Sequence, residues 1–258
     1  GSRGSIITSD GYPLVLNQAV YTLGAYLPSV IDSPTELVDK VLGHVELSID
    51  DPLISTDSAK LELALKELKD STRSTMLDRL GKSGYVTLLR AVSVDEKEQL
   101  TQLQISGLTF DETFVRAYPE ASMSAQLTGF VGRDEVGNPK GYFGLEGYYD
   151  RELSGRSRIE KQEKDSSGNP LTVGNFQLLP GRDGRTLKLH IDRGVQYLVE
   201  SELKKGLEQY GAKSGEVIIM DPTTGGILAM ASFPTYDPAK FQYYDTRLYK
   251  NPSVANAY

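Results

Sequence analysis

The chain has 258 residues, 39% of them hydrophobic, and its 28 Lys and Arg against 35 Asp and Glu give a formal net charge of −7. At roughly 150 residues per domain, this length predicts one large domain or two ordinary ones. The acidic balance argues against a nucleic-acid partner, which would need clustered Lys and Arg. Cysteine is absent and the two histidines lack ligand spacing, so we expect no disulfide and no metal site.

The N-terminal segment is expected to form a β-hairpin of residues 5–9 and 12–17. Asp10-Gly11 between these apolar segments supplies the positive φ angles of a tight two-residue turn. A separate third strand is expected over residues 19–23.

A helical region follows, with clear start and stop signals. Ser33 to Glu36 forms a capping box with Pro at the first helical position, and Gly43 ends that helix. Ser93 opens a second capping box, whose helix ends near Gly107. Between them we expect two helices over 58–70 and 72–80 and a strand over 85–92.

Residues 110–179 are rich in Gly, Tyr and polar residues, which favours short elements and turns. A short helix is expected near residues 121–127, and residues 137–144 form a turn cluster. Residues 161–170 combine four charges with Ser-Ser-Gly-Asn-Pro, so an exposed hairpin tip or a mobile loop is expected there.

The character of the sequence changes after residue 180. Residues 186–191 alternate apolar and polar side chains, as a half-buried strand does, and Asp192 caps a helix that Gly211 ends. Two strands follow over 216–220 and 227–231, joined by a loop.

The nearly continuous hydrophobicity of these last two strands predicts burial on both faces. The chain has few residues left to cover them. We therefore expect this C-terminal part to be poorly ordered, to associate with another chain, or to pack against a separate fragment.

Three short patterns match the motifs of serine acyl transferases. Residues 201–204 read S-x-x-K, residues 167–169 read S-x-N, and K-S-G occurs at 82–84 and 213–215. The S-x-N match precedes S-x-x-K, and Ser201 and Lys204 lie off the apolar stripe of their helix, facing solvent. Because three-residue matches are common by accident, the non-catalytic interpretation is favoured.

Other site classes have weaker signals. No spacing selects a carboxylate pair for glycoside hydrolysis, and no phosphate-binding glycine motif is present, so we expect no cofactor. The Tyr pairs at 148–149 and 243–244 favour packing or a protein interface.

Arg3, Arg116 and Glu146 lie beside turn glycines or proline, and their convergence would tie the N-terminal hairpin to residues 110–150. The alternative is three ordinary surface charges. We predict ion-pairing distance between Arg3 and Glu146.

Several segments form an ordered set. Residues 3–11 read Arg-Gly-Ser-Ile-Ile-Thr-Ser-Asp-Gly, residues 116–119 read Arg-Ala-Tyr-Pro, and residues 144–146 read Gly-Leu-Glu. Residues 187–192 with Gln196, and residues 215–234, complete the set. This order resembles the class B penicillin-binding proteins, although Thr8 and Ser9 replace their usual Asp and Arg. The motif positions are Arg3, Gly4, Arg116, Tyr118, Pro119, Gly144, Glu146, Asp192, Asp221 and Gly225.

The resemblance implies an α+β fold. It implies an elongated pedestal of hairpins over residues 3–180, with an inserted helical lobe at about 33–107. It also implies that 181–258 is an incomplete strand–helix–hairpin start of a transpeptidase domain. The family's S-x-x-K would follow a few residues after Tyr258, with S-x-N and K-T-G further on. No catalytic residue is therefore carried over, and we expect this chain alone to be inactive toward penicillin.

The family also implies a context for the chain. The parent would be a peptidoglycan D,D-transpeptidase at the extracytoplasmic face of the bacterial plasma membrane, anchored by a helix upstream of Arg3. Its partners would be cell-wall morphogenesis proteins, with a dimer allowed and no nucleic acid. Peptidoglycan and β-lactams would be bound only by the catalytic domain. The alternative is a stand-alone extracytoplasmic protein-interaction module without enzymatic role.

Overall fold

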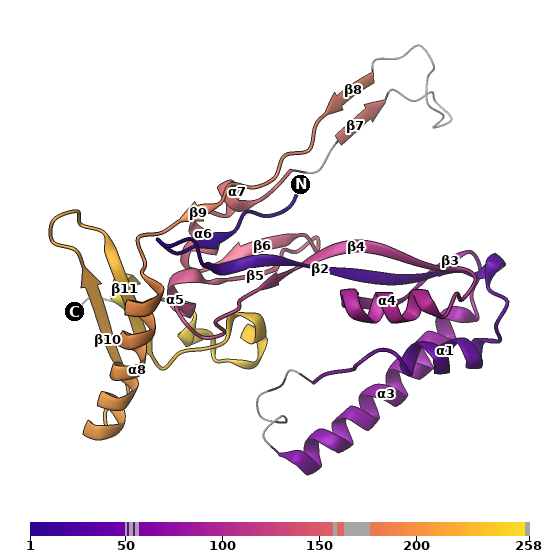
Figure 1. Cartoon of the computed structure of the whole chain (residues 1–258), viewed down its shortest axis with the longest axis horizontal. Helices are drawn as coiled ribbons and strands as arrows, with labels where there is room; N and C mark the ends of the chain where they lie inside the picture. Colours follow the sequence, from indigo (N-terminus) through magenta and orange to yellow (C-terminus); the bar gives the residue numbers. More distant parts are fainter. Residues whose placement is uncertain (50, 52–53, 55–56, 157–158, 163–175, 256–258) are drawn as a thin grey trace. The chain divides into compact units, whose positions relative to one another are not determined.

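The computed structural model describes residues 1–258 except 50, 52–53, 55–56, 157–158, 163–175 and 256–258 (Figure 1). The chain divides into two compact units, of which unit 1 comprises Gly1–Asn17 and Arg116–Tyr258 and unit 2 comprises Gln18–Val115. Helices and mostly antiparallel strands alternate irregularly along it, which confirms the predicted α+β class. The predicted domain boundary at residue 180 stays a prediction.

Unit 1 begins with a small strand assembly. β1 (Ile6–Ile7) pairs antiparallel with the start of β2 (Pro13–Tyr26) and parallel with β9 (Leu187–Lys188). The core beneath these strands contains Ile6, Leu14, Val15, Met123 and Leu153. The N-terminal strand is thereby fixed between two distant parts of the sequence.

The β1–β2 connection differs from the predicted two-residue turn. The Thr8 N–H donates to the Tyr12 carbonyl at 2.9 Å, and the Gly11 N–H donates to the Thr8 carbonyl at 3.1 Å. Three residues therefore form the loop, and of these Gly11 has positive φ (89°), as a turn followed by a glycine bulge requires. The buried Thr8 hydroxyl also bonds the Asp10 carboxylate, which favours this wider loop.

The separate third strand predicted over 19–23 is wrong, because β2 continues through it for 14 residues. β2 pairs with β1 near its start and with β3 (Tyr85–Val92) from Tyr21 onward, and it also pairs with β4 (Leu108–Ala117).

The middle of unit 1 consists of short elements. They are α5 (Ala125–Thr128), β5 (Phe130–Arg133), β6 (Pro139–Tyr142), α6 (Gly144–Tyr148), α7 (Asp150–Leu153), β7 (Ile159–Gln162) and β8 (Phe176–Leu179). β5 pairs with β6, and β7 pairs with β8, both antiparallel. Most of the loop predicted at 161–170 lies outside the described residues. The strand predicted over 186–191 is shorter, limited to β9.

The C-terminal part of unit 1 is a helix on a hairpin. Its elements are α8 (Arg193–Tyr210), β10 (Gly215–Met220), β11 (Ile227–Phe233), η2 (Pro238–Tyr243), η3 (Thr246–Leu248) and α9 (Pro252–Ala255). Val199 of α8 packs against Ala229 and Ala231 of β11. The prediction that the chain has too few residues to cover these two strands is therefore wrong for the face that α8 packs against. The opposite face leaves Ile218 46% and Met220 54% exposed.

Unit 2 holds a separate core between strands and helices. It contains the rest of β2, β3, most of β4 (Leu108–Ala117), and η1 (Leu27–Ser29), α1 (Pro34–Leu42), α3 (Ser58–Leu80) and α4 (Val94–Gln102). Both predicted capping boxes are confirmed, at Ser33 with Glu36 and at Ser93 with Glu96. The two helices predicted over 58–80 form one, α3, because Ser71 bonds the Leu68 carbonyl within the helix rather than ending it.

Among the described residues, none of the helices is both long and apolar enough to cross a bilayer.

Candidate functional site

The most densely bonded polar cluster of unit 1 is centred on Glu146. This carboxylate is fully buried, and a guanidinium lies against each of its two oxygens. A buried carboxylate is stable only when it is paired and hydrogen-bonded. We call Arg3, Arg116 and Glu146 the arginine clamp.

Arg3 approaches the clamp from the N-terminal strand. Its Nε donates to Glu146 Oε2 at 2.7 Å, and its Nη2 lies 2.5 Å from the same oxygen. Its Nη1 donates to Asp150 Oδ1 at 2.7 Å and to Ser154 Oγ at 3.0 Å. The predicted ion pair between Arg3 and Glu146 is therefore confirmed, and the alternative of separate surface charges is wrong.

Arg116 approaches from the end of β4. Its Nε donates to Glu146 Oε1 at 2.7 Å, and its Nη2 lies 2.6 Å from that oxygen. Its remaining donors reach the Asn17 side-chain oxygen at 2.8 Å and the Gly4 carbonyl at 2.7 Å. Asn17 in turn donates to the Arg3 carbonyl. The clamp thus ties the N-terminal strand, β2, β4 and α6 together within unit 1.

Two glycines allow the backbone to bring these side chains together. Gly144 opens α6 at φ 46°, and a Cβ there would lie 2.5 Å from the Leu127 carbonyl oxygen. A Cβ on Gly4 would lie 2.0 Å from the Arg185 carbonyl oxygen. Any larger residue at either position would push apart the segments that carry the clamp.

Tyr118 and Pro119 follow Arg116 but do not join the clamp. The Tyr118 hydroxyl accepts the Val131 N–H at 3.1 Å, and burial, with the nearby Glu146 charge, raises the pKa of this phenol. Tyr118 packs beside a cluster of aromatic rings, and Pro119 is exposed. The buried members of this cluster include Phe130, Tyr236 and Tyr249.

A second polar group joins α8 to β11. The fully buried Gln196 amide donates to the Met230 carbonyl at 2.9 Å and accepts the Met230 N–H at 2.8 Å. It therefore satisfies both backbone groups of Met230, as a neighbouring strand would. Gln196 also donates to Glu200, which accepts the Ser124 N–H at 2.8 Å. Burial raises the pKa of Glu200. Through Ser124, this group links α8 to the segment before α5.

The remaining motif positions lie at turns. Asp192 caps α8 by accepting the Val195 N–H at 2.9 Å. Asp221 closes the β10–β11 loop by accepting the Thr223 N–H, and Gly225 completes that loop at φ 74°. The structure therefore brings Arg3, Gly4, Arg116 and Glu146 together, beside Gly144, and leaves Asp192, Asp221 and Gly225 as local caps and turns.

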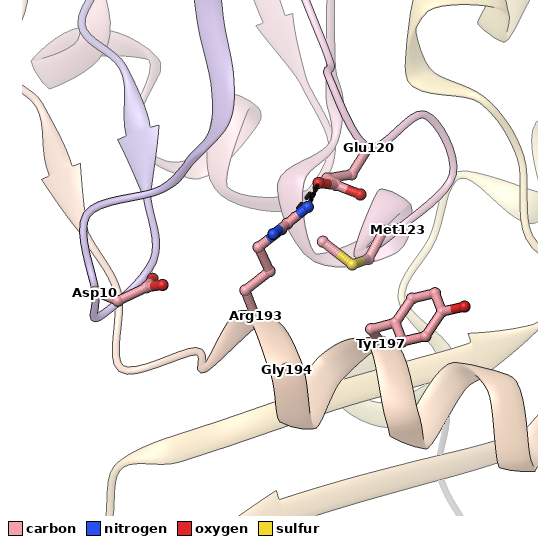
Figure 2. Close-up of a pocket in the computed structure, with 6 residues that line it drawn as sticks. All are labelled: Asp10, Glu120, Met123, Arg193, Gly194 and Tyr197. Atoms are coloured by element: carbon pink, nitrogen blue, oxygen red, sulfur yellow. Dashed lines mark hydrogen bonds and ion pairs between the residues drawn. The ribbon is translucent and has the colours of Figure 1, made fainter.

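A pocket of about 360 Å³ lies beside the start of α8 (Figure 2). Its lining residues are Asp10, Glu120, Met123, Arg193, Gly194 and Tyr197. Arg193 Nη2 lies 2.5 Å from Glu120 Oε1, and the guanidinium stacks 4.0 Å from the Tyr12 ring centre. Burial acts to raise the pKa of Glu120, but hydrogen bonds from Arg193 and Tyr12 lower it. Arg193 and Glu120 of the pocket are thus already paired, and Asp10 accepts a hydrogen bond from Thr8.

The acyl-transfer patterns do not assemble into a site. Lys204 of α8 is exposed, as predicted, whereas Ser201 is half-buried. The K-S-G segments at 82–84 and 213–215 belong to different units, and residues 167–169 lie outside the described residues. In the polar clusters of unit 1, the side chains of Arg3, Arg116 and Gln196 bond to backbone groups as well as to other side chains.

Comparison with known proteins identifies the family of the chain. The family model described as the penicillin-binding protein dimerisation domain matches residues 1–189. The chain belongs to this family. The predicted resemblance to class B penicillin-binding proteins is confirmed.

The chain is similar to two curated proteins over nearly all of its length. It is 26% identical to stage V sporulation protein D of Bacillus subtilis, over 99% of the chain and 36% of that protein. It is also 26% identical to peptidoglycan D,D-transpeptidase FtsI of Escherichia coli K12, over 100% of the chain and 40% of FtsI. The chain thus spans well under half the length of these relatives.

One solved structure shares the fold. Penicillin-binding protein 2X from Streptococcus thermophilus matches with a TM-score of 0.65 at 19% identity, over 95% of this chain and 37% of that one.

Proposed function

We propose that this chain is the non-catalytic pedestal of a peptidoglycan D,D-transpeptidase, together with the first part of its transpeptidase domain. The arginine clamp is the observation that carries the proposal. It fixes the N-terminal strand to α6 with a fully buried carboxylate, which is a structural use of charge rather than a catalytic one. The relatives named as D,D-transpeptidases extend the same proposal to the parent protein.

The pedestal would set the position of the catalytic domain. Within unit 1, the hydrogen bonds of Gln196 and Glu200 join α8 and β11 to the segment before α5. We infer that the parent lies on the extracytoplasmic face of the plasma membrane, held by a helix upstream of Arg3. Cell-wall morphogenesis proteins would dock on the pedestal, and the family's description supports self-association.

An interaction module without a transpeptidase domain is the second candidate. Its support is that the polar clusters described above all hold structure rather than catalyse. The coding sequence beyond Tyr258 separates the two candidates, because the enzyme requires an S-x-x-K motif within a few residues and a stop codon would favour the module.

The positioning role can be tested in the complete protein with matched carboxylate variants. Glu146→Gln breaks the buried clamp, whereas Glu202→Gln breaks an exposed ion pair of 2.7 Å with Lys205. We expect Glu146→Gln to retain covalent penicillin binding but to lose cell-wall cross-linking in a complementation assay, and Glu202→Gln to retain both. Full complementation by Glu146→Gln would reject the positioning role.

A further inference from the structure

Arg156 and Arg182 form an isolated antiparallel bridge outside β7 and β8, and this bridge places two like charges opposite each other. The Arg156 N–H donates to the Arg182 carbonyl at 2.7 Å, and the Arg182 N–H donates to the Arg156 carbonyl at 2.9 Å. Residues that exchange both hydrogen bonds lie directly opposite each other, with their side chains on the same side of the ribbon. Two like charges in this arrangement repel, so the fold gains nothing from the pair.

These two arginines belong to a larger basic patch on unit 1. Both side chains are exposed, as are those of Arg151 on α7, Arg185, and Lys188 on β9. Among the described residues, none of these five side chains is in a salt bridge. The acidic residues of the same segments are Asp150, which pairs with Arg3, Glu152, which is exposed, and Asp183, which accepts from the Ser2 N–H and hydroxyl. We call the five cations the basic patch.

The Arg156–Arg182 part of the basic patch lies beside the start of the chain. Figure 1 shows the N-terminus beside α7 and the strands that lead to β7 and β8. The Gly184 N–H donates to the Ser2 carbonyl at 2.8 Å, and a Cβ on Gly1 would lie 1.9 Å from the Arg182 carbonyl oxygen. The N-terminal backbone therefore contacts the backbone of the arginine pair.

We propose that the basic patch binds the anionic headgroups of a phospholipid bilayer. The inference rests on the proposed function for one point, that a membrane helix precedes Arg3. Such a helix would bring the patch near the membrane surface, where headgroup charges act over a Debye length of about 8 Å. Anionic phosphates would then neutralise the Arg156–Arg182 repulsion, and arginine is well suited to pair with phosphate oxygens. A positive face on a chain of net charge −7 would also orient unit 1 at the bilayer.

The test uses the purified chain and vesicles, so it does not depend on any transpeptidase activity. Binding is measured by co-sedimentation with vesicles of phosphatidylcholine alone and of phosphatidylcholine with 30% phosphatidylglycerol, at about 0.05 and 0.3 M salt. We expect binding only to the anionic vesicles, weakened by salt. Because each cation near an anionic surface contributes roughly fivefold in affinity, Arg156→Gln/Arg182→Gln should weaken binding about 25-fold.

A matched control carries the same change of charge elsewhere in unit 1. Lys204 and Lys213 are both exposed, and Lys204→Gln/Lys213→Gln should change binding less than twofold. The arginine variant should melt at or above the wild-type temperature, because a repulsive pair is removed. Equal losses in the two variants, equal binding to neutral vesicles, or binding of polyphosphate without binding of vesicles would each overturn the proposal. Failure here would leave the pedestal proposal intact.

Discussion

Replacing Glu146 by Gln keeps the shape of the arginine clamp but removes its central charge. Four nitrogen–oxygen contacts of 2.5–2.7 Å converge on this carboxylate. The exposed fractions of the side chains are 10% for Arg3, 6% for Arg116 and 0% for Glu146. Solvent therefore cannot replace the lost interactions, and both guanidiniums are left without the carboxylate between them.

The size of the effect follows from burial. Hydrogen bonds to charged groups contribute about 1.5–3 kcal/mol each, so four of them set an upper bound of roughly 6–12 kcal/mol. Arg3 keeps Asp150, and Arg116 keeps Asn17 and the Gly4 carbonyl, so the full amount is not lost. Removing one partner of a buried ion pair costs about 3–5 kcal/mol, and we expect that loss here. This is a large part of a typical stability of about 5–15 kcal/mol.

Urea unfolding followed by far-UV circular dichroism measures the loss. The control is Glu202→Gln, which removes an exposed carboxylate paired with Lys205 and should cost less than about 1 kcal/mol. For Glu146→Gln we also expect a fall in Tm of roughly 6–20 °C. An unfolding free energy within about 1 kcal/mol of wild type would refute the idea that the clamp holds unit 1 together.

Three further outcomes are expected. Glu200 has a pKa raised above its ordinary value of 4.5, chiefly by burial, so its contribution to stability is present below pH 4.5 and is lost as the pH rises through the folded-state value. In urea unfolding at pH 5 and pH 8, the free energy of unfolding of Glu200→Gln should therefore rise relative to that of wild type as the pH rises. A difference that does not change with pH would contradict this. Gly144→Ala should lower the free energy of unfolding by about 1–3 kcal/mol, because the new Cβ meets the Leu127 carbonyl, whereas Gly137→Ala, with positive φ but open space, should cost about 1 kcal/mol. Equal melting temperatures of the two variants would rule out the steric cause. Gln196→Leu should cost about 1–3 kcal/mol and speed hydrogen exchange at the Met230 amide, and unchanged protection would show that another group satisfies that amide.

Local signals in the sequence predicted local structure well. The capping boxes at Ser33 and Ser93 and the Asp192 cap depend on contacts within three residues, so they could be identified without tertiary information. The break predicted between residues 70 and 72 does not occur, and the Ser71 hydroxyl bonds a carbonyl inside the helix. The β-strand at 108–117 was missed, since residues 111–115 are all exposed and show no alternation.

The polar partners of the clamp needed the fold. Arg3 and Glu146 are separated by 143 residues, and their positions beside turn glycines suggested that they meet without excluding three ordinary surface charges. Asn17 and Asp150 were missed altogether, because nothing in their neighbouring residues indicates that an arginine from elsewhere will reach them. The cover that α8 gives to one face of the β10–β11 hairpin was likewise missed, since an apolar strand gives no sign of which of its faces the same chain covers.

Covalent labelling with a fluorescent penicillin tests the central claim most directly. We expect no stoichiometric labelling of this chain, whose S-x-x-K match at Ser201 lies on a helix with Lys204 exposed. A longer protein that continues through an S-x-x-K motif after Tyr258 should bind one penicillin per chain. Stoichiometric labelling of this chain, abolished by Ser201→Ala, would contradict the non-catalytic assignment.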